Sequence, residues 1–174
     1  MREPSLAELD KIRREGYRPG VVVCLINQER LLMAYSVEHG LWQIPQGGIM
    51  GGESLMTALV RTVEEELGEE VASGVNLSLE IVGVDRVEFP PNKTEGKSIM
   101  TETGEELSMK GKHYFLAKSE CLVTEFDMSK CVYGVVRWVG YKEALELASQ
   151  IYQRGKRRMT ETAIERLKEA KAIT

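Results

Sequence analysis

The chain of 174 residues is long enough for one domain with its own core, and its 43% hydrophobic and 29% charged content is typical of a globular protein. Its net charge of −4 argues against a protein that coats nucleic acid by general electrostatic attraction. Three cysteines without C-x-x-C spacing favour reduced thiols and a cytoplasmic location, and we expect neither a signal peptide nor a membrane span.

Residues 5–15 are predicted to form a short helix. Ser5 and Glu8 have the spacing of a capping box, in which each side chain bonds the backbone N–H of the other residue. We interpret Arg13 and Arg14, near the end of this helix, as parts of a solvated face.

Two strands are predicted next, at 21–26 and 31–36, and they are expected to pair as a hairpin through a turn at 27–30. The first is rich in β-branched residues. Cys24 within it is expected to be a small core residue.

The stretch from Trp42 to Gly68, WQIPQGGIMGGESLMTALVRTVEEELG, predicts a strand, a glycine-rich turn and a helix. Either Ser54 or Glu53 is expected to open the helix, and Gly68 to end it. The turn has the glycine spacing of a phosphate-binding P-loop. We reject that interpretation because Glu53 stands where the P-loop requires lysine.

The end of this helix carries two adjacent carboxylates, Glu65 and Glu66. Helical spacing places Thr62 on the same face as both of them. Because neighbouring like charges repel, the pair gains from a bound cation, and carboxylate oxygens suit Mg²⁺ or Mn²⁺.

The second half of the chain predicts alternating strands, loops and helices. We expect a loop at 71–76, strands at 77–89, 111–118 and 135–139, and helices at 141–152 and 159–170. Residues 92–109 are predicted to form a long loop or a loose hairpin, and 121–126 to continue the strand pairing. The basic segment 154–158 is interpreted as a solvated connection, with contact to phosphate or RNA as the functional alternative. This order predicts an α/β fold with helices on both faces of a mixed sheet.

The stretch around the acidic helix resembles the Nudix box, G-x5-E-x7-R-E-U-x-E-E-x-G-U, where U is a bulky aliphatic residue. Seven positions match at the family's spacing: Gly47, Glu53, Arg61, Val63, Glu65, Glu66 and Gly68. Thr62 replaces a glutamate of the box, and Glu69 replaces its last aliphatic residue. The resemblance implies one Nudix domain over residues 1–174, an α/β/α sandwich with the C-terminal helices of 141–174 packed on it.

Beyond the box, the chain is similar to the bacterial RNA pyrophosphohydrolase and diadenosine polyphosphate hydrolase branch of this family. The similarity is carried by the segments 16–19, 42–49 and 137–139. It implies Mg²⁺-dependent hydrolysis, with Mn²⁺ as an alternative metal, of a nucleoside diphosphate linked to another group. The implied substrate is a 5′-triphosphorylated RNA end or a dinucleoside polyphosphate, and no membrane partner is expected.

The same resemblance implies roles for individual residues. Metal ligands are expected from Glu65, Glu66 and the carbonyl of Gly47, with Arg61 orienting the carboxylates. The catalytic base is expected to be Glu125, with Glu105 and Glu106 as rivals. Structural roles in the box fall to Gly47, Gly48, Glu53 and Gly68, and Glu53 is expected to pair within the loop–helix unit. We expect the substrate to contact Arg18, Gln43, Trp42 and Lys112.

Two aromatic residues are further candidates for the ligand site. We predict that Tyr17 and Trp42 lie near one another or near the mouth of the site, where an aromatic ring can stack on a base. Core packing is the alternative for Trp42.

Two alternatives to that function remain, and the second of them follows from the threonine at position 62. In several relatives the matching glutamate is a metal ligand or the base, and a threonine hydroxyl does not replace it near neutral pH. One alternative is hydrolysis of another nucleotide, such as ADP-ribose or a nucleoside triphosphate. The other is a catalytically weak nucleotide-binding module.

Overall fold

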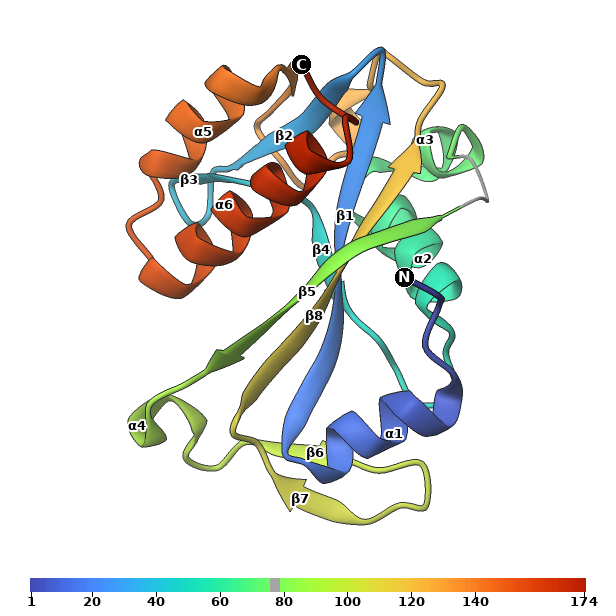
Figure 1. Cartoon of the computed structure of the whole chain (residues 1–174), viewed down its shortest axis with the longest axis vertical. Coiled ribbons are helices and arrows are strands. Elements are labelled where there is room, and N and C mark those ends of the chain that lie inside the picture. The colour runs from blue at the N-terminus through green and yellow to red at the C-terminus, as the bar shows by residue number, and fades with distance from the viewer. Residues whose placement is uncertain (76–78) are drawn as a thin grey trace.

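Strand β1 (Tyr17–Asn27) is the central strand of the sheet (Figure 1). The computed structural model describes residues 1–75 and 79–174. β1 pairs in parallel with β8 (Gly111–Glu120) along almost its whole length. Its other edge is shared, because β4 (Gln46–Gly48) pairs near its start and β2 (Arg30–Ser36) at its end.

Seven of the described strands form this sheet, with β3-β2-β1-β8-β5 as its main order. β3 (Leu41–Gln43) and β9 (Val135–Val139) flank β2, and β5 (Glu80–Glu88) lies along β8. These outer pairings are antiparallel, whereas β1 and β8 are parallel. The predicted mixed sheet is therefore confirmed.

Both faces of the central strand are buried, as expected for its continuous apolar sequence. Val21, Val23 and Leu25 belong to one hydrophobic cluster, and Val22 and Cys24 belong to another on the opposite face. The core position predicted for Cys24 is confirmed.

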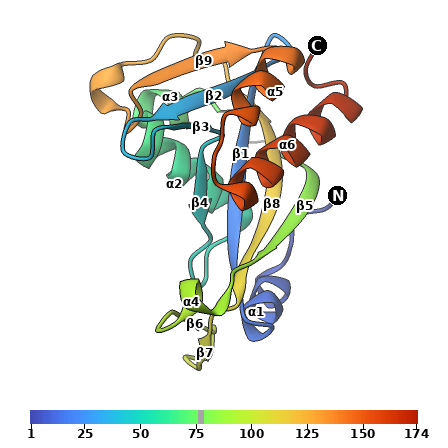
Figure 2. The ribbon, with the colours of Figure 1, turned by 90° about the vertical axis from the view of Figure 1, so that its left-hand side faces the viewer.

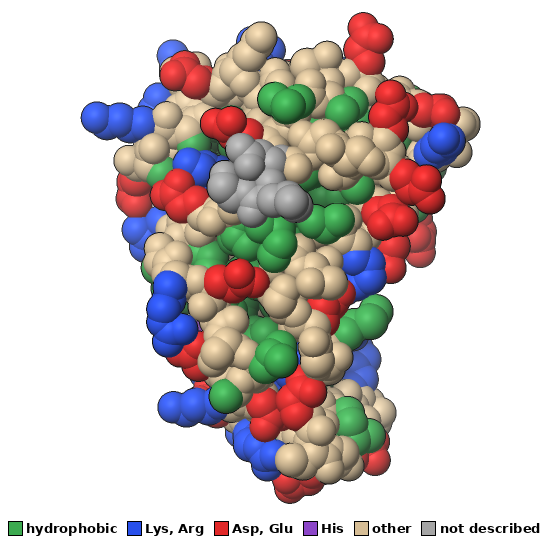
Figure 3. Space-filling view, turned by 90° about the vertical axis from the view of Figure 1, so that its right-hand side faces the viewer, with side chains coloured by type: hydrophobic (Ala, Val, Ile, Leu, Met, Phe, Trp, Pro, Cys, Tyr) green, Lys and Arg blue, Asp and Glu red, His purple; other side chains and the backbone are tan. Residues whose placement is uncertain are grey.

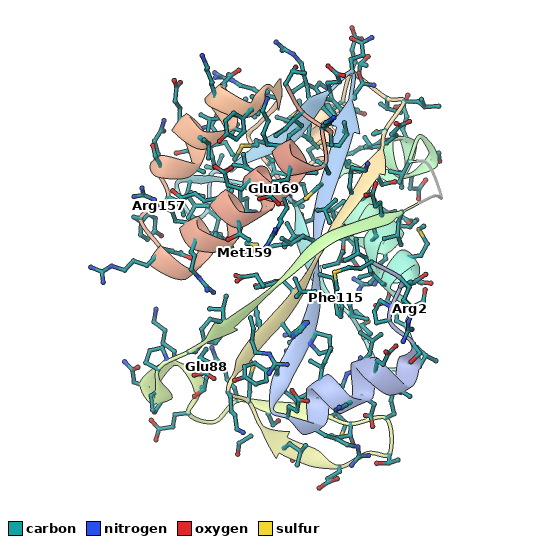
Figure 4. All side chains as sticks on the ribbon, viewed as in Figure 1. Arg2, Glu88, Phe115, Arg157, Met159 and Glu169 are labelled. Atoms are coloured by element: carbon teal, nitrogen blue, oxygen red, sulfur yellow. The ribbon has the colours of Figure 1, made fainter. Side chains whose placement is uncertain are left out.

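Helices cover both sides of the sheet (Figure 2). One side carries α1 (Leu6–Arg14), α2 (Leu55–Leu67) and the short α3 (Glu69–Ser73). The other carries α5 (Tyr141–Ser149) and α6 (Arg154–Glu169). Figure 4 shows the two sides through Phe115, which packs with the α2 side, and Met159, which lies between α6 and the sheet. The predicted α/β/α architecture is confirmed.

A small second sheet lies at the far end of the long strands from α5 (Figure 1). It consists of β6 (Ser98–Met100) and β7 (Glu106–Ser108), and the single turn α4 (Pro91–Thr94) precedes it. Of the two structures predicted for residues 92–109, the hairpin is thus the one that forms.

The structure corrects three expectations for the second half of the chain. Part of the loop predicted at 71–76 belongs to α3, and the strand predicted from residue 77 begins at Glu80. Residues 76–78 lie outside the described residues. After β8 the strand pairing reduces to one bridge, between Val75 and Cys121, and a 3-10 turn η1 (Met128–Lys130) follows.

The basic segment 154–158 is the first part of α6 rather than a connection. Arginine and lysine are good helix formers, and Gly155 is tolerated there. Of the helices in residues 1–75 and 79–174, none combines the length and hydropathy needed to cross a membrane.

Arg13 is buried, so our interpretation of it as part of a solvated face is wrong. Its side chain is 3% exposed and donates to the carbonyls of Ile49 (3.2 Å) and Met50 (2.9 Å). It also pairs with Glu102 at 2.7 Å, and Glu102 in turn accepts from the backbone N–H of Gly52. The guanidinium therefore holds α1, the glycine-rich turn and the loop between β6 and β7 together.

Replacement of this arginine should lower the stability of the whole domain. Arg13→Gln removes the guanidinium that two carbonyls and the Glu102 carboxylate share, which should reduce the free energy of unfolding by about 3 kcal/mol. Arg14→Gln is the matched control, because Arg14 is 42% exposed and should leave stability close to that of the wild type. Urea denaturation of both variants makes the comparison, and equal stabilities would refute the role of Arg13.

Candidate active site

Helix α2 lies against β4 through a very close contact between Gly47 and Thr62. A Cβ atom on Gly47 would stand 2.1 Å from Thr62 Oγ1, so only glycine fits here without movement. Thr62 is 1% exposed and its hydroxyl donates to the carbonyl of Ala58 at 2.7 Å. Thr62 therefore faces the sheet, and Glu66, one turn further along, also faces β4, so the shared face expected from helical spacing holds for these two residues, whereas Glu65 lies on the exposed side of the helix.

This contact predicts a specific rescue. Gly47→Ala should destabilise the protein by about 2 kcal/mol through overpacking. Adding Thr62→Ala removes the clashing hydroxyl and leaves the Thr62 Cβ at 3.2 Å, so the double variant should recover most of that loss. Gly51→Ala is the control, because its Cβ would meet its nearest neighbour at 3.6 Å. A double variant no more stable than Gly47→Ala, measured by urea unfolding, would contradict the packing described.

Arg61 ties the glycine-rich turn to α2. Its guanidinium donates to both oxygens of Glu53, at 2.8 and 2.9 Å, and to the carbonyl of Gly48 at 2.7 Å. Glu53 also accepts from the N–H of Met50, so the expected pairing of Glu53 within the loop–helix unit is present. Hydrogen bonding to Arg61 lowers the pKa of Glu53, and the same pair raises the pKa of Arg61. A fourth bond, at 3.1 Å, links Arg61 to Glu65.

The caps of α2 are as expected from the sequence. Ser54, the first of the two candidates, opens the helix by accepting from the N–H of Thr57. Gly68 ends it with a φ of +103°, a conformation that side chains with a Cβ avoid.

An acidic groove follows the exposed side of α2. It encloses about 500 Å³ and is lined by Arg61, Glu64, Glu65, Gly68, Glu69 and Lys130. The side of the molecule that bears α2 and α3 shows acidic side chains gathered along one margin (Figure 3). Such a surface suits a cation rather than an anion.

Glu66 points inward from the same helix and is half-buried. It accepts hydrogen bonds from the hydroxyl of Tyr133 and from the backbone N–H of Gln46. Burial raises the pKa of Glu66, and burial together with the neighbouring carboxylate raises the pKa of Tyr133. Glu66 thus lies next to β4, while Glu65 remains at the surface.

On the sheet side of β4 lies a basic hollow. One part, of about 140 Å³, is lined by Arg18, Pro19, Gly20, Gln46, Gly47, Gly48, Lys112 and Tyr114. The adjoining part, of about 320 Å³, shares Gln46, Lys112 and Tyr114 and extends to Lys156, Phe89, Met159 and His39. The structure therefore brings Arg18 and Lys112, which the sequence singled out, together with the Gly47–Gly48 backbone.

The cations of this hollow disfavour one another. Burial and the nearby Arg18 and Lys97 lower the pKa of Lys112, and burial and Lys112 lower the pKa of Lys156. An anion bound between them would relieve that repulsion. The side-chain oxygen of Gln46 is also buried here without a hydrogen-bond partner in the described chain, so it can accept from a ligand.

Gln43 and Trp42 lie outside this hollow. Gln43 is 8% exposed, and its amide bonds both Lys156 (2.5 Å) and Tyr133 (3.1 Å). Trp42 is half-buried and packs against Tyr35 and Arg137, with the tryptophan and tyrosine ring centroids 5.5 Å apart.

Tyr17 does not accompany Trp42, so of the two arrangements predicted for them, near one another or near the mouth of the site, the first is wrong. Its hydroxyl donates to Glu88 and its ring lies 4.2 Å from the Arg86 guanidinium. Tyr17 is the first residue of β1, whereas Trp42 lies in β3, which pairs with β2 at the other end of β1.

The three candidate bases lie in different places. Glu125 is exposed, in the segment that follows β8, and that segment contacts α2 where the Val132 N–H donates to the backbone carbonyl of Glu66. Glu105 is paired with Arg14, and Glu106 lies in β7. Because the β6–β7 hairpin folds against α1, it does not bring these two glutamates to Glu66.

Two residues of the site were missed from the sequence. Lys156 stands in a segment interpreted as solvated, although the alternative of phosphate contact was also considered. Tyr133 comes from an irregular segment with no motif, and nothing in the sequence singles it out.

The donor set for a metal is small. Within the described residues, no three His, Cys, Asp or Glu side chains form a group that could hold an ion. The candidate oxygen donors are Glu66 and the Gly47 carbonyl, next to the basic hollow, and Glu65 on the exposed side of the same helix. This set fits Mg²⁺, which is usually held by one or two carboxylates, waters and substrate phosphates.

A family model of the NUDIX domain matches residues 16–161. The chain belongs to the Nudix hydrolase family. Members of this family are pyrophosphohydrolases that act on nucleotide or RNA substrates and generally use divalent metals.

Individual relatives agree with that membership. The Nudix chain is 30% identical to an RNA pyrophosphohydrolase of Marinomonas sp. (strain MWYL1), over 90% of this chain and 98% of that protein. It is 42% identical to Nudix hydrolase 25 of Arabidopsis thaliana over 78 residues, which are 44% of this chain and only 43% of that protein. The E. coli dihydroneopterin triphosphate pyrophosphohydrolase shares the fold, with a TM-score of 0.59 at 16% identity, covering 86% of this chain and 97% of that one.

Proposed function

We propose that this Nudix protein is a Mg²⁺-dependent hydrolase of 5′-triphosphorylated RNA ends or of dinucleoside polyphosphates. The observation that carries the proposal is the basic hollow on one side of β4, next to the carboxylates of α2 on the other. Lys112 and Arg18 meet the Gly47–Gly48 backbone there, so a polyphosphate held by these cations reaches Glu66 and the Gly47 carbonyl. A relative that matches along most of this chain is an RNA pyrophosphohydrolase.

The proposal assigns different residues to phosphate binding, metal binding and the orientation of the metal ligands. Arg18, Lys112 and Lys156 bind the phosphate oxygens, and Glu65 and Glu66 hold the metal together with the Gly47 carbonyl. A bound metal supplies positive charge against the charge that develops when water attacks a phosphorus. Arg61 orients Glu65 and keeps the turn in place through Glu53.

The general base in this proposal is Glu125. Thr62 is buried against Gly47 and bonded to Ala58, which excludes it from that part. Of the three candidate glutamates, Glu125 lies on the segment that contacts α2. Its carboxylate is exposed and has no hydrogen-bond or ion-pair partner among the described residues.

A panel of substrates tests the proposal directly. With Mg²⁺ present, we expect release of phosphate or pyrophosphate from triphosphorylated RNA, or of two nucleotides from a dinucleoside polyphosphate, in preference to hydrolysis of ADP-ribose and nucleoside triphosphates. Preference for one of the latter two would replace the proposed substrate class. Binding without turnover of any compound would instead support a binding module.

Glu66→Gln should weaken Mn²⁺ binding and lower turnover by roughly 10²-fold or more, because the metal contributes several kcal/mol of charge stabilisation. Glu70→Gln, an exposed change on the neighbouring α3, removes the same charge as a control and should alter neither quantity. Calorimetric titration and initial rates measure the two effects. Full metal affinity in Glu66→Gln would exclude Glu66 as a ligand.

Lys112→Met should raise KM for the polyphosphate substrate by roughly 10-fold or more. The variant loses one charge-assisted hydrogen bond to the substrate, and this bond is expected in both the bound ground state and the transition state. Lys118→Met is the control on the same strand, because Lys118 pairs with Glu80 away from the hollow. Steady-state kinetics of the two variants make the test. Equal KM values would show that the hollow does not bind the substrate phosphates.

A further inference from the structure

Four side chains form a continuous hydrogen-bonded series between the basic hollow and the acidic helix. Lys156 Nζ donates to Gln43 Oε1 at 2.5 Å, and Gln43 Nε2 donates to the Tyr133 hydroxyl at 3.1 Å. The Tyr133 hydroxyl then donates to Glu66 Oε2. The two middle members are buried, with Gln43 8% and Tyr133 5% exposed, so water does not compete for these bonds.

The charges at the two ends determine the direction of every bond in this series. A lysine ammonium can only donate, so the amide oxygen of Gln43 must face Lys156 and its NH₂ group must face Tyr133. The phenol oxygen accepts from that NH₂ group, and its single hydrogen is left for Glu66. An ionised carboxylate can only accept, so the direction is consistent at the other end as well.

We infer that Gln43 and Tyr133 are positioning residues that fix Glu66 for metal binding and couple it to the phosphate-binding Lys156. This inference rests on the proposed function, because it takes Glu66 as a metal ligand. Gln43, which the sequence suggested as a substrate contact, instead acts through its neighbours. Lys156 has three N–H donors, so the bond to Gln43 leaves others for a phosphate in the hollow.

The hydrogen-bonded series matters for metal binding in this chain because few carboxylates are available as ligands. A further carboxylate of the Nudix box, which could join Glu65 and Glu66 at the metal, is absent, because Thr62 stands in its place and faces Gly47. Fewer ligands make the orientation of each one more important. Tyr133 and the Gln46 N–H together hold the Glu66 carboxylate at its position beside β4.

Tyr133→Phe is the direct test. It removes one hydroxyl and should weaken Mn²⁺ binding, measured by calorimetry without substrate, by roughly 10- to 100-fold, the usual effect of losing a partner of a metal ligand. Tyr141→Phe is the matched control, since Tyr141 also donates to a glutamate, Glu165, far from the site. It should bind Mn²⁺ like the wild type.

Gln43→Glu separates the series from simple electrostatics. The new carboxylate would accept from both Lys156 and Tyr133, and so would draw the phenol hydrogen away from Glu66. We expect weaker Mn²⁺ binding, although an added negative charge nearby would by itself strengthen it. The effect should also vanish in the Tyr133→Phe background, which a general loss of structure would not produce.

The outcomes distinguish this inference from the function on which it rests. Unchanged Mn²⁺ affinity in Tyr133→Phe, or tighter binding in Gln43→Glu, would overturn the inference alone. A wild type that binds no Mn²⁺ would overturn the metal assignment in the proposed function, and the inference with it. Weakened binding in both variants, with the control unchanged, is the expected result.

Discussion

The contact between Gly47 and Thr62 is the constraint on which the site depends. It brings the middle of α2 against β4 at a distance that no other residue at position 47 allows without movement. One turn further along the helix, Glu66 therefore lies beside the Gln46 backbone and close to the basic hollow on the sheet. The carboxylates of α2 and the basic hollow are neighbours because Thr62 packs directly against Gly47.

The two sides of this contact differ in their prevailing charge. The groove along α2 carries three glutamates beside Arg61 and Lys130, whereas the hollow between β1, β8 and α6 carries lysine and arginine side chains. A polyphosphate with its metal ion has the same division of charge. The protein therefore combines a negative net charge of −4 with a basic hollow that suits an anion.

Local signals in the sequence predicted what local interactions determine. The glycine-rich turn and α2 contain every residue that these predictions need: Ser54 begins the helix, Gly68 ends it, and Glu53 pairs with Arg61. Sequence alone misjudged Arg13 because its partners lie 36 to 89 positions away, and it left Lys156 undecided because Gln43 is 113 positions away. Helical spacing placed Thr62 on one face with Glu66, but it does not record how closely a neighbouring strand approaches, so the burial of Thr62 against Gly47 was not predicted.

The position of Glu102 has a consequence for the order in which the protein acquires its structure. This carboxylate completes the contacts of the glycine-rich turn through Gly52 and Arg13, yet it lies 50 residues after that turn in the chain. Likewise, β1 obtains its parallel partner only when β8 has been made. During synthesis from the N-terminus, the turn is therefore produced early but reaches its final form only after the β6–β7 hairpin has left the ribosome.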